Sequence, residues 1–242
     1  MKHLSLFLLI AMLSLPIFAQ EDTDIKQQKN QIDIDVTDIP TAFFTLSYER
    51  ALGKHISVGL GVGLKSEDGL IQFSGIDTDK IQTNDITYSG YKLLPEFRYY
   101  INESTNGAML SGFYVGAYLK YSDFNSDLIG TYVDSEDVSH LFEYSADIAV
   151  TSVGFMVGYK LPVSKRFSID FLIAGPGTGN YNFKLDNIIP PPDEFYDDLN
   201  NALDEYSILD LINADFGFNN NKLRSKFSAL SFRYGISVGY SF

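Results

Sequence analysis

The sequence contains no cysteine and no tryptophan, only three histidines, and 18 lysines and arginines against 31 aspartates and glutamates. Without cysteine, the exported chain has no disulfide and is not a lipoprotein. The net charge of −13 argues against nucleic acid as a partner, because domains that bind nucleic acids are basic. That charge suits metal ions, basic partners or simple solvation. Since only His55 and His140 lie outside the first few residues, we expect no enzymatic activity, no catalytic residue and no cofactor.

Long apolar runs are also absent, except at the N-terminus. Lys2, the apolar stretch Leu4–Leu15 and the following Pro16 predict a secretory signal peptide over residues 1–19. A membrane-anchor helix is the alternative, but the apolar stretch is too short to span a bilayer and ends at proline. We therefore expect export, removal of the signal peptide, and a short periplasmic segment over residues 20–30.

The most regular pattern is the one at the C-terminus, from Ala229 to Phe242. From Leu230 onward every second residue is large and apolar, and the residues between are small or polar. A period of two predicts a β-strand with one apolar face. Strands in soluble sheets usually have about five or six residues, whereas a strand that crosses a bilayer needs about 9–11. The end of this strand, with Val238, Tyr240 and Phe242, resembles the signal that the barrel assembly machinery of the outer membrane recognises.

Seven further segments alternate in the same way, with one apolar face and one face rich in Gly, Ser, Lys and Glu. They are residues 31–36, 42–49, 56–65, 86–101, 109–121, 147–160 and 166–174. The last of these has an optional continuation through Tyr181 and Phe183, after a glycine-rich break at residues 175–179. Pro95 cannot donate to a ladder, so we expect a bulge there. A soluble barrel or sandwich would also alternate, but strand length and the terminal Phe242 favour a membrane barrel.

The connections between these segments alternate in length. Short ones at 51–54, 102–107 and 161–165 alternate with long ones at about 66–85, 122–146 and 186–227, and a bend at Pro40 makes one short external connection. In an up-and-down barrel, alternate connections share a rim, so this order predicts short periplasmic turns and long external loops. The predicted fold class is all-β: an eight-stranded antiparallel up-and-down transmembrane β-barrel over residues 31–242, with one helix in a long external loop.

Two short motifs add a family resemblance. Residues 94–100, followed by Gly112–Gly116, and residues 44–50, followed by Gly53, resemble small outer-membrane β-barrel proteins of Bacteroidetes-type bacteria. The resemblance implies a barrel related to the OmpA, OmpX and OmpW kind, located in the outer membrane and in contact with its lipid. It carries over no catalytic residue.

Charged residues at inward positions are the candidate functional set. They are Glu49, Lys92, Glu96, Arg98, Lys120, Lys160, Asp170 and Arg233. An eight-stranded barrel is just wide enough for side chains to fill, and buried charges must be paired. One interpretation is a salt-bridged plug that stiffens the barrel, with Glu96 paired to Arg98, Lys92 or Arg233. The other is a narrow gated pore or proton path.

Residues 66–85, 122–147 and 186–221, which make up most of the long connections, hold 21 of the 31 acidic residues and only one base, Lys80. Solvated external loops explain this, and so does a surface for a partner or a divalent cation, with residues 77–79 and 134–137 as candidate oxygen clusters. Three prolines at 190–192 precede a helical pattern over residues 193–212. That helix suits either a lid on the barrel mouth or a docking element for a surface partner.

Taken together, these patterns favour a structural or surface-interaction protein of the outer membrane, a rigid ion-paired barrel that displays acidic external loops. A narrow passive channel or small-molecule transporter is the alternative. Conductance separates the two, because a plug of paired charges closes the lumen and an unpaired lining leaves it open.

Overall fold

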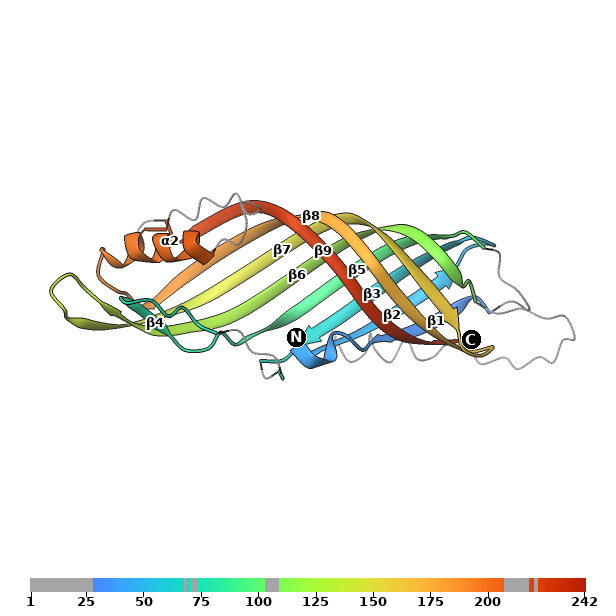
Figure 1. Ribbon diagram of the computed structural model, residues 1–242, viewed down its shortest axis with the longest axis horizontal. Helices are drawn as coiled ribbons and strands as arrows, with labels where there is room; N and C mark the ends of the chain where they lie inside the picture. Colours follow the sequence, from blue (N-terminus) through green and yellow to red (C-terminus); the bar gives the residue numbers. More distant parts are fainter. Residues whose placement is uncertain (1–27, 68, 71–73, 103–108, 207–217, 220–221) are drawn as a thin grey trace, which may run out of the picture.

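The computed structural model describes residues 28–67, 69–70, 74–102, 109–206, 218–219 and 222–242 (Figure 1). The predicted signal peptide and residues 20–27 lie outside the described residues, as does the end of the predicted helix beyond residue 206.

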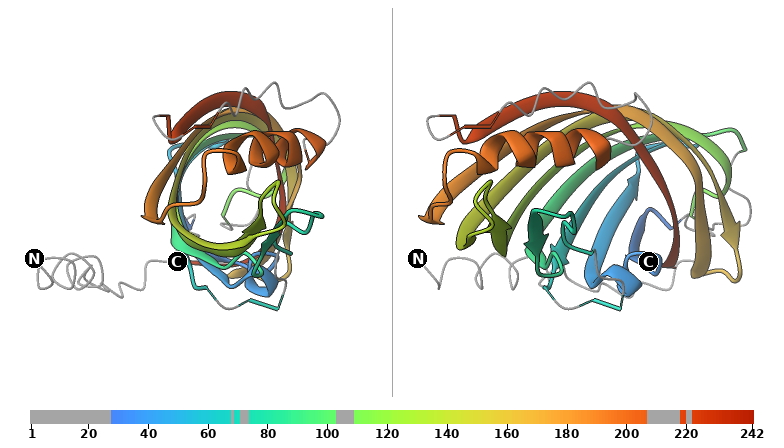
Figure 2. Two further views of the ribbon diagram at one scale, coloured as in Figure 1. Left: turned by 90° about the vertical axis from the view of Figure 1, so that its left-hand side faces the viewer. Right: turned by 60° about the vertical axis from the view of Figure 1, so that its left-hand side comes forward.

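Eight long or medium strands close into a ring of antiparallel neighbours. They are β1 (Asn30–Asp35), β2 (Phe43–Ala51), β3 (Ile56–Lys65), β5 (Tyr88–Tyr100), β6 (Gly112–Val133), β7 (Ser139–Pro162), β8 (Phe167–Ile189) and β9 (Arg224–Ser241). Each pairs with the next along the chain, and β1 pairs with β9, for example Ile32 with Tyr240. Figure 2 looks along the ring in its left-hand view. The predicted eight-stranded antiparallel barrel is confirmed.

The period of two in each strand sets the two faces of the ring. On β9, Phe232 and Ile236 lie exposed on the outer face, whereas Ser231 and Gly235 are buried inside. The same apolar exterior runs around β2, β3, β5, β6 and β7. A sheet with this exterior is suited to lipid, where closure is required because an open edge would leave backbone groups unpaired.

At one end of the barrel, several strands continue further than the sequence predicted. Residues 122–146, expected as a loop, form the outer parts of β6 and β7, which stay paired up to Val133 and Ser139. Strand β8 likewise runs on to Ile189, through the glycine-rich segment, with a register shift between Leu172 and Gly175. We call these outer parts of β6, β7, β8 and β9 the external extension.

In the external extension the polar face of the strands points outward and the apolar face inward. This reversal explains why the sequence pattern predicted loops there. The outward positions of the extension are mostly polar, among them Asp127 and Asn182, whereas inward positions carry Tyr132, Phe142 and other apolar side chains. Because acidic residues occupy outward positions in residues 122–146, the sequence of this segment resembled that of a solvated loop. The point of reversal marks the upper edge of the apolar belt. On β9 this belt runs from Leu230 to Phe242, about 30 Å at the usual rise and tilt of a barrel strand.

Pro95 causes no bulge, so that prediction was wrong. Pro95 pairs with Leu60 on β3, and the register of β5 against β6 is the same on both sides of it, from Leu93 with Tyr121 to Glu96 with Tyr118. The ladder to β6 lacks pairs only at Leu94 and Pro95. The missing N–H of Pro95 is accommodated because Leu94 and Pro95 stay unpaired to β6, so the strand needs no extra residue in the form of a bulge.

The connections at the external end carry three small elements. The 3-10 helix η1 (Ile39–Thr41) makes the expected short bend at Pro40. The short strand β4 (Ile81–Thr83) pairs with β6, Ile81 facing Tyr132. The helix α2 (Phe195–Tyr206) follows the three prolines, with Asp197 and Asp198 in its first turn, where acidic residues are favourable. Figure 1 shows β4 and α2 at the same end of the barrel.

The described part of the chain contains no helix that is long and apolar enough to cross a membrane. Its only helices are η1 and α2.

Candidate functional site

Six charged side chains meet inside the barrel, near the C-terminal end of β5. We call them the lumen network, and they are Glu49, Glu96, Arg98, Lys160, Asp170 and Arg233. They come from β2, β5, β7, β8 and β9, and each occupies an inward position of its strand. All six belong to the set that the sequence predicted to face the lumen.

Arg98 is the centre of the lumen network. Its guanidinium donates to Asp170 at 2.5 Å, to Glu96 at 2.7 Å and to Glu49 at 3.3 Å. It also lies over the ring of Tyr114, 4.7 Å from the centroid. A guanidinium has five N–H donors in a fixed fork, so it can join three carboxylates at once.

Glu49 is the most enclosed carboxylate of the lumen network. It accepts hydrogen bonds from Lys160 Nζ at 2.5 Å, Ser57 Oγ at 2.5 Å and Tyr100 Oη at 2.8 Å. The side chain of Lys160 is 0 % exposed. An ion pair this deeply buried is tolerated only when further hydrogen bonds satisfy both charges, and Glu49 receives them.

Two of these pairs join opposite walls of the ring. The ring order is β1, β2, β3, β5, β6, β7, β8, β9, so β2 faces β7 and β5 faces β9. Glu49 and Lys160 join β2 to β7, and Glu96 and Arg233 join β5 to β9 at 2.9 Å. Tyr114 donates to Asp170 at 2.9 Å beside them. Crossed pairs and aromatic rings thus fill the centre of the barrel.

One cavity in the lumen beside the network is small. This cavity of about 40 Å³ is lined by residues of β1, β2, β3, β5, β8 and β9, among them Asp33, Asp35 and Glu96. Liquid water occupies about 30 Å³ per molecule, so this volume suits roughly one water molecule. The cavity is too small to serve as an aqueous path.

Two predicted lumen residues lie outside the network. Lys92 pairs with Asp38 of the external bend, at 2.5 Å, and Asp38 also accepts a hydrogen bond from Thr45. Lys120 faces inward on β6, and no ion pair or hydrogen bond joins it to another described residue. Of the three partners predicted for Glu96, Arg98 and Arg233 are observed, whereas Lys92 pairs elsewhere.

Four residues that bond to the predicted lumen charges were missed by the sequence argument: Asp38, Ser57, Tyr100 and Tyr114. Tyr100 and Tyr114 share the inward parity of Arg98 and Lys160, so the period of two could have identified them. Asp38 stands in a bend, where parity gives no direction, and no sequence signal marks it as the partner of Lys92.

A second site is the external cap, which we define as α2 with the inner face of the external extension. Phe195 packs on Phe142 at 4.6 Å and on Tyr132 at 5.4 Å between ring centroids, and Tyr196 accepts a hydrogen bond from Tyr144 at 3.0 Å. Asp198 accepts from Lys80 at 3.0 Å. The described apolar residues of α2, Phe195, Tyr196, Leu199 and Ala202, are therefore buried, and they cover the barrel mouth.

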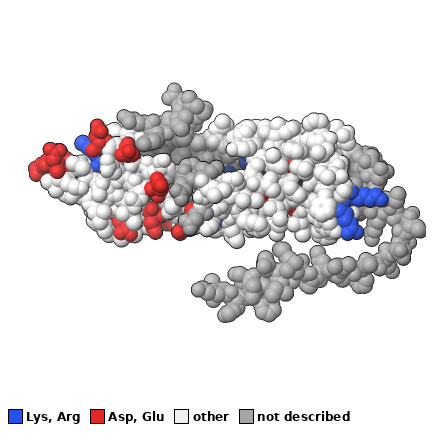
Figure 3. All heavy atoms as spheres, turned by 60° about the horizontal axis from the view of Figure 1, so that its bottom comes forward, with Lys and Arg blue, Asp and Glu red and all other residues white. Residues whose placement is uncertain are grey.

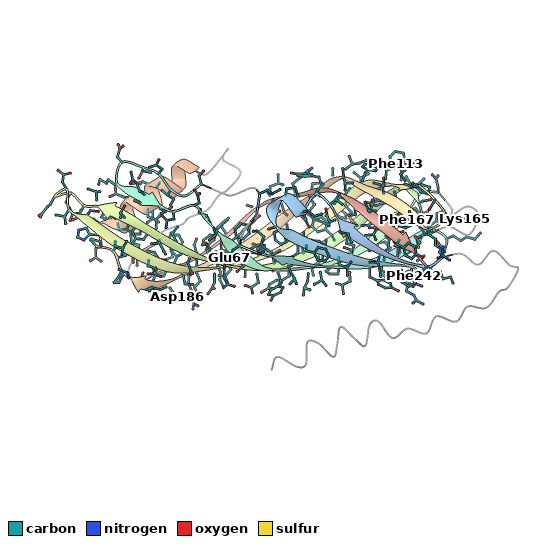
Figure 4. The ribbon with its side chains drawn as sticks, turned by 90° about the horizontal axis from the view of Figure 1, so that it is seen from below. Glu67, Phe113, Lys165, Phe167, Asp186 and Phe242 are labelled. Atoms are coloured by element: carbon teal, nitrogen blue, oxygen red, sulfur yellow. The ribbon has the colours of Figure 1, made fainter. Side chains whose placement is uncertain are left out.

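The acidic residues lie at the end of the barrel that carries the external cap. Figure 3 shows most of the visible Asp and Glu gathered at that end, with a few bases among them, and a separate group of bases at the other end. Figure 4 places Asp186 at the acidic end, and Lys165, Phe113, Phe167 and Phe242 at the opposite end. This agrees with a belt whose lower rim carries aromatic side chains, as in membrane barrels.

At the tip of the external extension, Asp134 is already used by its own turn. Its carboxylate accepts hydrogen bonds from the backbone N–H of Glu136 and Val138, each at 2.9 Å, and lies 2.7 Å from Nε2 of His140. These contacts hold the pKa of Asp134 below its usual range, the His140 contact first. In the described segments, no three metal-ligating side chains are close enough to hold an ion.

Comparison with known proteins gives one structure and one family. The crystal structure of CarO from Acinetobacter baumannii aligns with 91 % of this chain and 100 % of its own, at 11 % identity and a TM-score of 0.43. No curated protein matches the sequence. Residues 8–189 match the model of the family described as "Protein of unknown function (DUF3575)". That match spans most of the sequence, so the chain belongs to the DUF3575 family.

Proposed function

We propose that this protein is an outer-membrane β-barrel of structural or surface-interaction type. Its lumen is sealed by the lumen network, and it holds a folded, acidic external structure above the membrane. The observation that carries the proposal is the pair of ion pairs that cross the ring, Glu49 with Lys160 and Glu96 with Arg233.

The outer surface supports the membrane location. The belt on β9 spans about 30 Å, close to the hydrocarbon thickness of a bilayer. Above the belt, outward positions become polar, and towards its opposite edge aromatic rings pair across neighbouring strands, such as Phe113 with Tyr159 and Phe167 with Tyr240. Aromatic girdles of this kind sit at the interfaces of membrane barrels.

The lumen supports a structural role over transport. A solute that crosses would have to displace Arg98 from three carboxylates and separate both crossed pairs. Breaking a buried pair by removing one partner costs about 3–5 kcal/mol, so spontaneous opening of several contacts is rare.

Single-channel recording tests this proposal. The mature chain is refolded, its fold is checked by heat-modifiable gel migration, and it is inserted into a planar bilayer. We expect no regular openings. Reproducible openings of the folded protein would overturn the sealed-barrel proposal and favour the passive channel.

The acidic external end supports the proposed role in surface interaction. Asp186 on β8 and Asp127 on β6 are exposed there, and they suit a basic partner or a divalent cation. Calcium titration of the folded protein, followed by calorimetry, tests the cation. Heat of calcium binding that persists in about 0.5 M monovalent salt would support a cation site. Heat that disappears in this salt would indicate only a diffuse ion atmosphere.

The end of β9 supports recognition by the barrel assembly machinery. Val238, Tyr240 and Phe242 all lie on the exposed outer face and form an apolar row at the lower rim. Deletion of Phe242 is expected to lower the fraction of protein that becomes heat-modifiable in cells, while refolding in detergent remains. Equal assembly in cells would contradict this assignment.

A further inference from the structure

An outward-facing pocket of about 380 Å³ lies on neighbouring strands β7, β8 and β9. Its polar lining consists of Thr151, Asn180, Asn182, Lys226 and Ser228, and its other lining residues are uncharged. All five polar residues are exposed and stand at outward positions of their strands. No carboxylate lines the pocket, although it lies at the acidic end of the protein.

Each of the five polar residues of this pocket carries at least one hydrogen-bond donor, and Lys226 adds a positive charge. Ser228 donates to Oδ1 of Asn180 at 2.7 Å, which turns the amide nitrogen of Asn180 away from that contact. Among the residues that the structure describes, no carboxylate pairs with Lys226, and none pairs with Arg224 one outward position further along β9. Lysine, arginine and amide N–H groups together favour an anion.

Lys184 is a further base near the pocket, and its charge is paired with acidic side chains. Lys184 of β8 stands opposite Arg224 in the ladder and forms ion pairs with Asp186 and, at 3.6 Å, with Asp147. The nearby acids are therefore held by Lys184. The charges of Lys226 and Arg224 remain available to a ligand.

The height of the pocket points to the class of ligand. On β9, Leu230 and Phe232 of the apolar belt lie directly below Ser228 and Lys226, and on β8, Pro176 and Thr178 lie below Asn180. The pocket thus sits where the belt ends and lipid headgroups begin. Basic groups at this level attract the phosphates of anionic lipids.

We propose that this pocket binds the phosphorylated headgroup of a lipid of the outer leaflet. Lys226 supplies the charged contact, Asn182 and Asn180 donate from their amide groups, and Arg224 adds a second charge at the upper edge. The acyl chains lie on the belt along Leu230 and Phe232. This inference rests on the proposed membrane location but does not depend on whether the lumen is sealed.

Native mass spectrometry of the folded chain in detergent tests the pocket, with diphosphoryl lipid A as the probe. The double variant Lys226→Ala with Asn182→Ala removes one charge and one donor. We expect it to bind the probe about tenfold more weakly than the unaltered chain, as for the loss of a charge-assisted hydrogen bond. Lys165→Ala removes the same charge at the opposite rim and is expected to bind normally. Heat-modifiable migration confirms that each variant is folded.

Two further probes identify the ligand chemistry. Lipid A without phosphates is expected to bind as weakly to the unaltered chain as the phosphorylated probe binds to the double variant. Inorganic phosphate at equal concentration is expected not to compete. Unchanged binding by the double variant would overturn the site, equal binding of the dephosphorylated lipid would overturn the role of phosphate, and competition by inorganic phosphate would overturn the assignment to a lipid. Failure of the unaltered chain to insert into bilayers at all would instead count against the proposed function.

Discussion

The ammonium group of Lys160 lies 2.5 Å from the carboxylate of Glu49, on the opposite wall of the barrel and 111 residues away in the chain. The pair is shielded from water, and Glu49 receives further hydrogen bonds from Ser57 and Tyr100. A buried pair of this kind gains little net stability over apolar residues, but loss of one partner leaves an uncompensated charge. The pair therefore fixes the lumen in one arrangement more than it adds to stability.

Glu49→Gln is predicted to destabilise the barrel strongly, because Lys160 then keeps its charge without a carboxylate. We expect the free energy of unfolding to fall by about 3–5 kcal/mol. Urea unfolding in detergent micelles, followed by circular dichroism, measures it. The double variant Glu49→Gln with Lys160→Met removes both charges and should recover most of the loss. Equal losses in the single and double variants would contradict this account.

The barrel was predictable from the sequence because its outer face is apolar where each strand crosses the belt. The period of two places Phe232 and Ile236 outside and Ser231 inside, as observed. The external extension was not recognised because its polarity is reversed: Asp127 faces out and Tyr132 faces in. A search for alternation of either sign, instead of an apolar outer face, would have followed β6 as far as Val133.

The lumen charges were predictable as a set but not as pairs. Parity places Glu96 and Arg98 on the inner face, and the structure joins them at 2.7 Å. The partner across the ring depends on strand register and barrel stagger, which parity does not give. For this reason Lys92 stood as one of three alternative partners of Glu96, whereas it pairs with Asp38 of the bend.

Removal of both lumen arginines is predicted to open the barrel. Arg98→Ala with Arg233→Ala releases Glu96 from its two partners and leaves Asp170 with Tyr114. Repelled carboxylates and two lost side chains should let water and cations enter. We expect cation-selective openings in planar bilayers, where the unaltered protein is silent.

Lys120→Ala is the matched control for this opening. It also removes an inward base, but one without an ion pair to another described residue. It should remain silent. Openings in the control would show that the loss of any inward base is enough, and that the crossed pairs are not the seal.

The position of the apolar belt predicts where charge is tolerated on the outer face. Phe155 of β7 is 76 % exposed in the middle of the belt. Phe155→Arg is expected to lower the free energy of unfolding in lipid vesicles by about 2–4 kcal/mol, as for arginine at the bilayer midplane. Ile129→Arg stands on the outer face of the external extension and should change it by less than about 1 kcal/mol. Similar losses at the two positions would contradict the boundary drawn at the reversal of polarity.

Phe195 is predicted to hold the external cap in place. Phe195→Ala removes a buried ring that contacts both Phe142 and Tyr132, a loss of about 3–5 kcal/mol in a packed core. Because this core lies in the external extension and shares no residue with the lumen network, we expect faster proteolysis between α2 and β9 with unchanged heat-modifiable migration. Asn201→Ala changes an exposed residue of the same helix and should leave proteolysis unchanged. Loss of the barrel itself in Phe195→Ala would show that the two cores are coupled.

Acid is predicted to loosen the tip of the external extension. The contact with His140 and the backbone N–H groups of Glu136 and Val138 hold the pKa of Asp134 below its usual range. Since the folded-state pKa is the lower one, the contribution of Asp134 to the turn is present above its unfolded-state pKa, about 3.9. That contribution is lost as the pH falls through the folded-state pKa. Carbon-13 NMR titration of the Asp134 carboxyl group in micelles measures the shift, and His140→Gln should move this pKa upward toward its usual range. An unchanged pKa in that variant would show that the backbone N–H groups alone hold the carboxylate, and that His140 does not contribute.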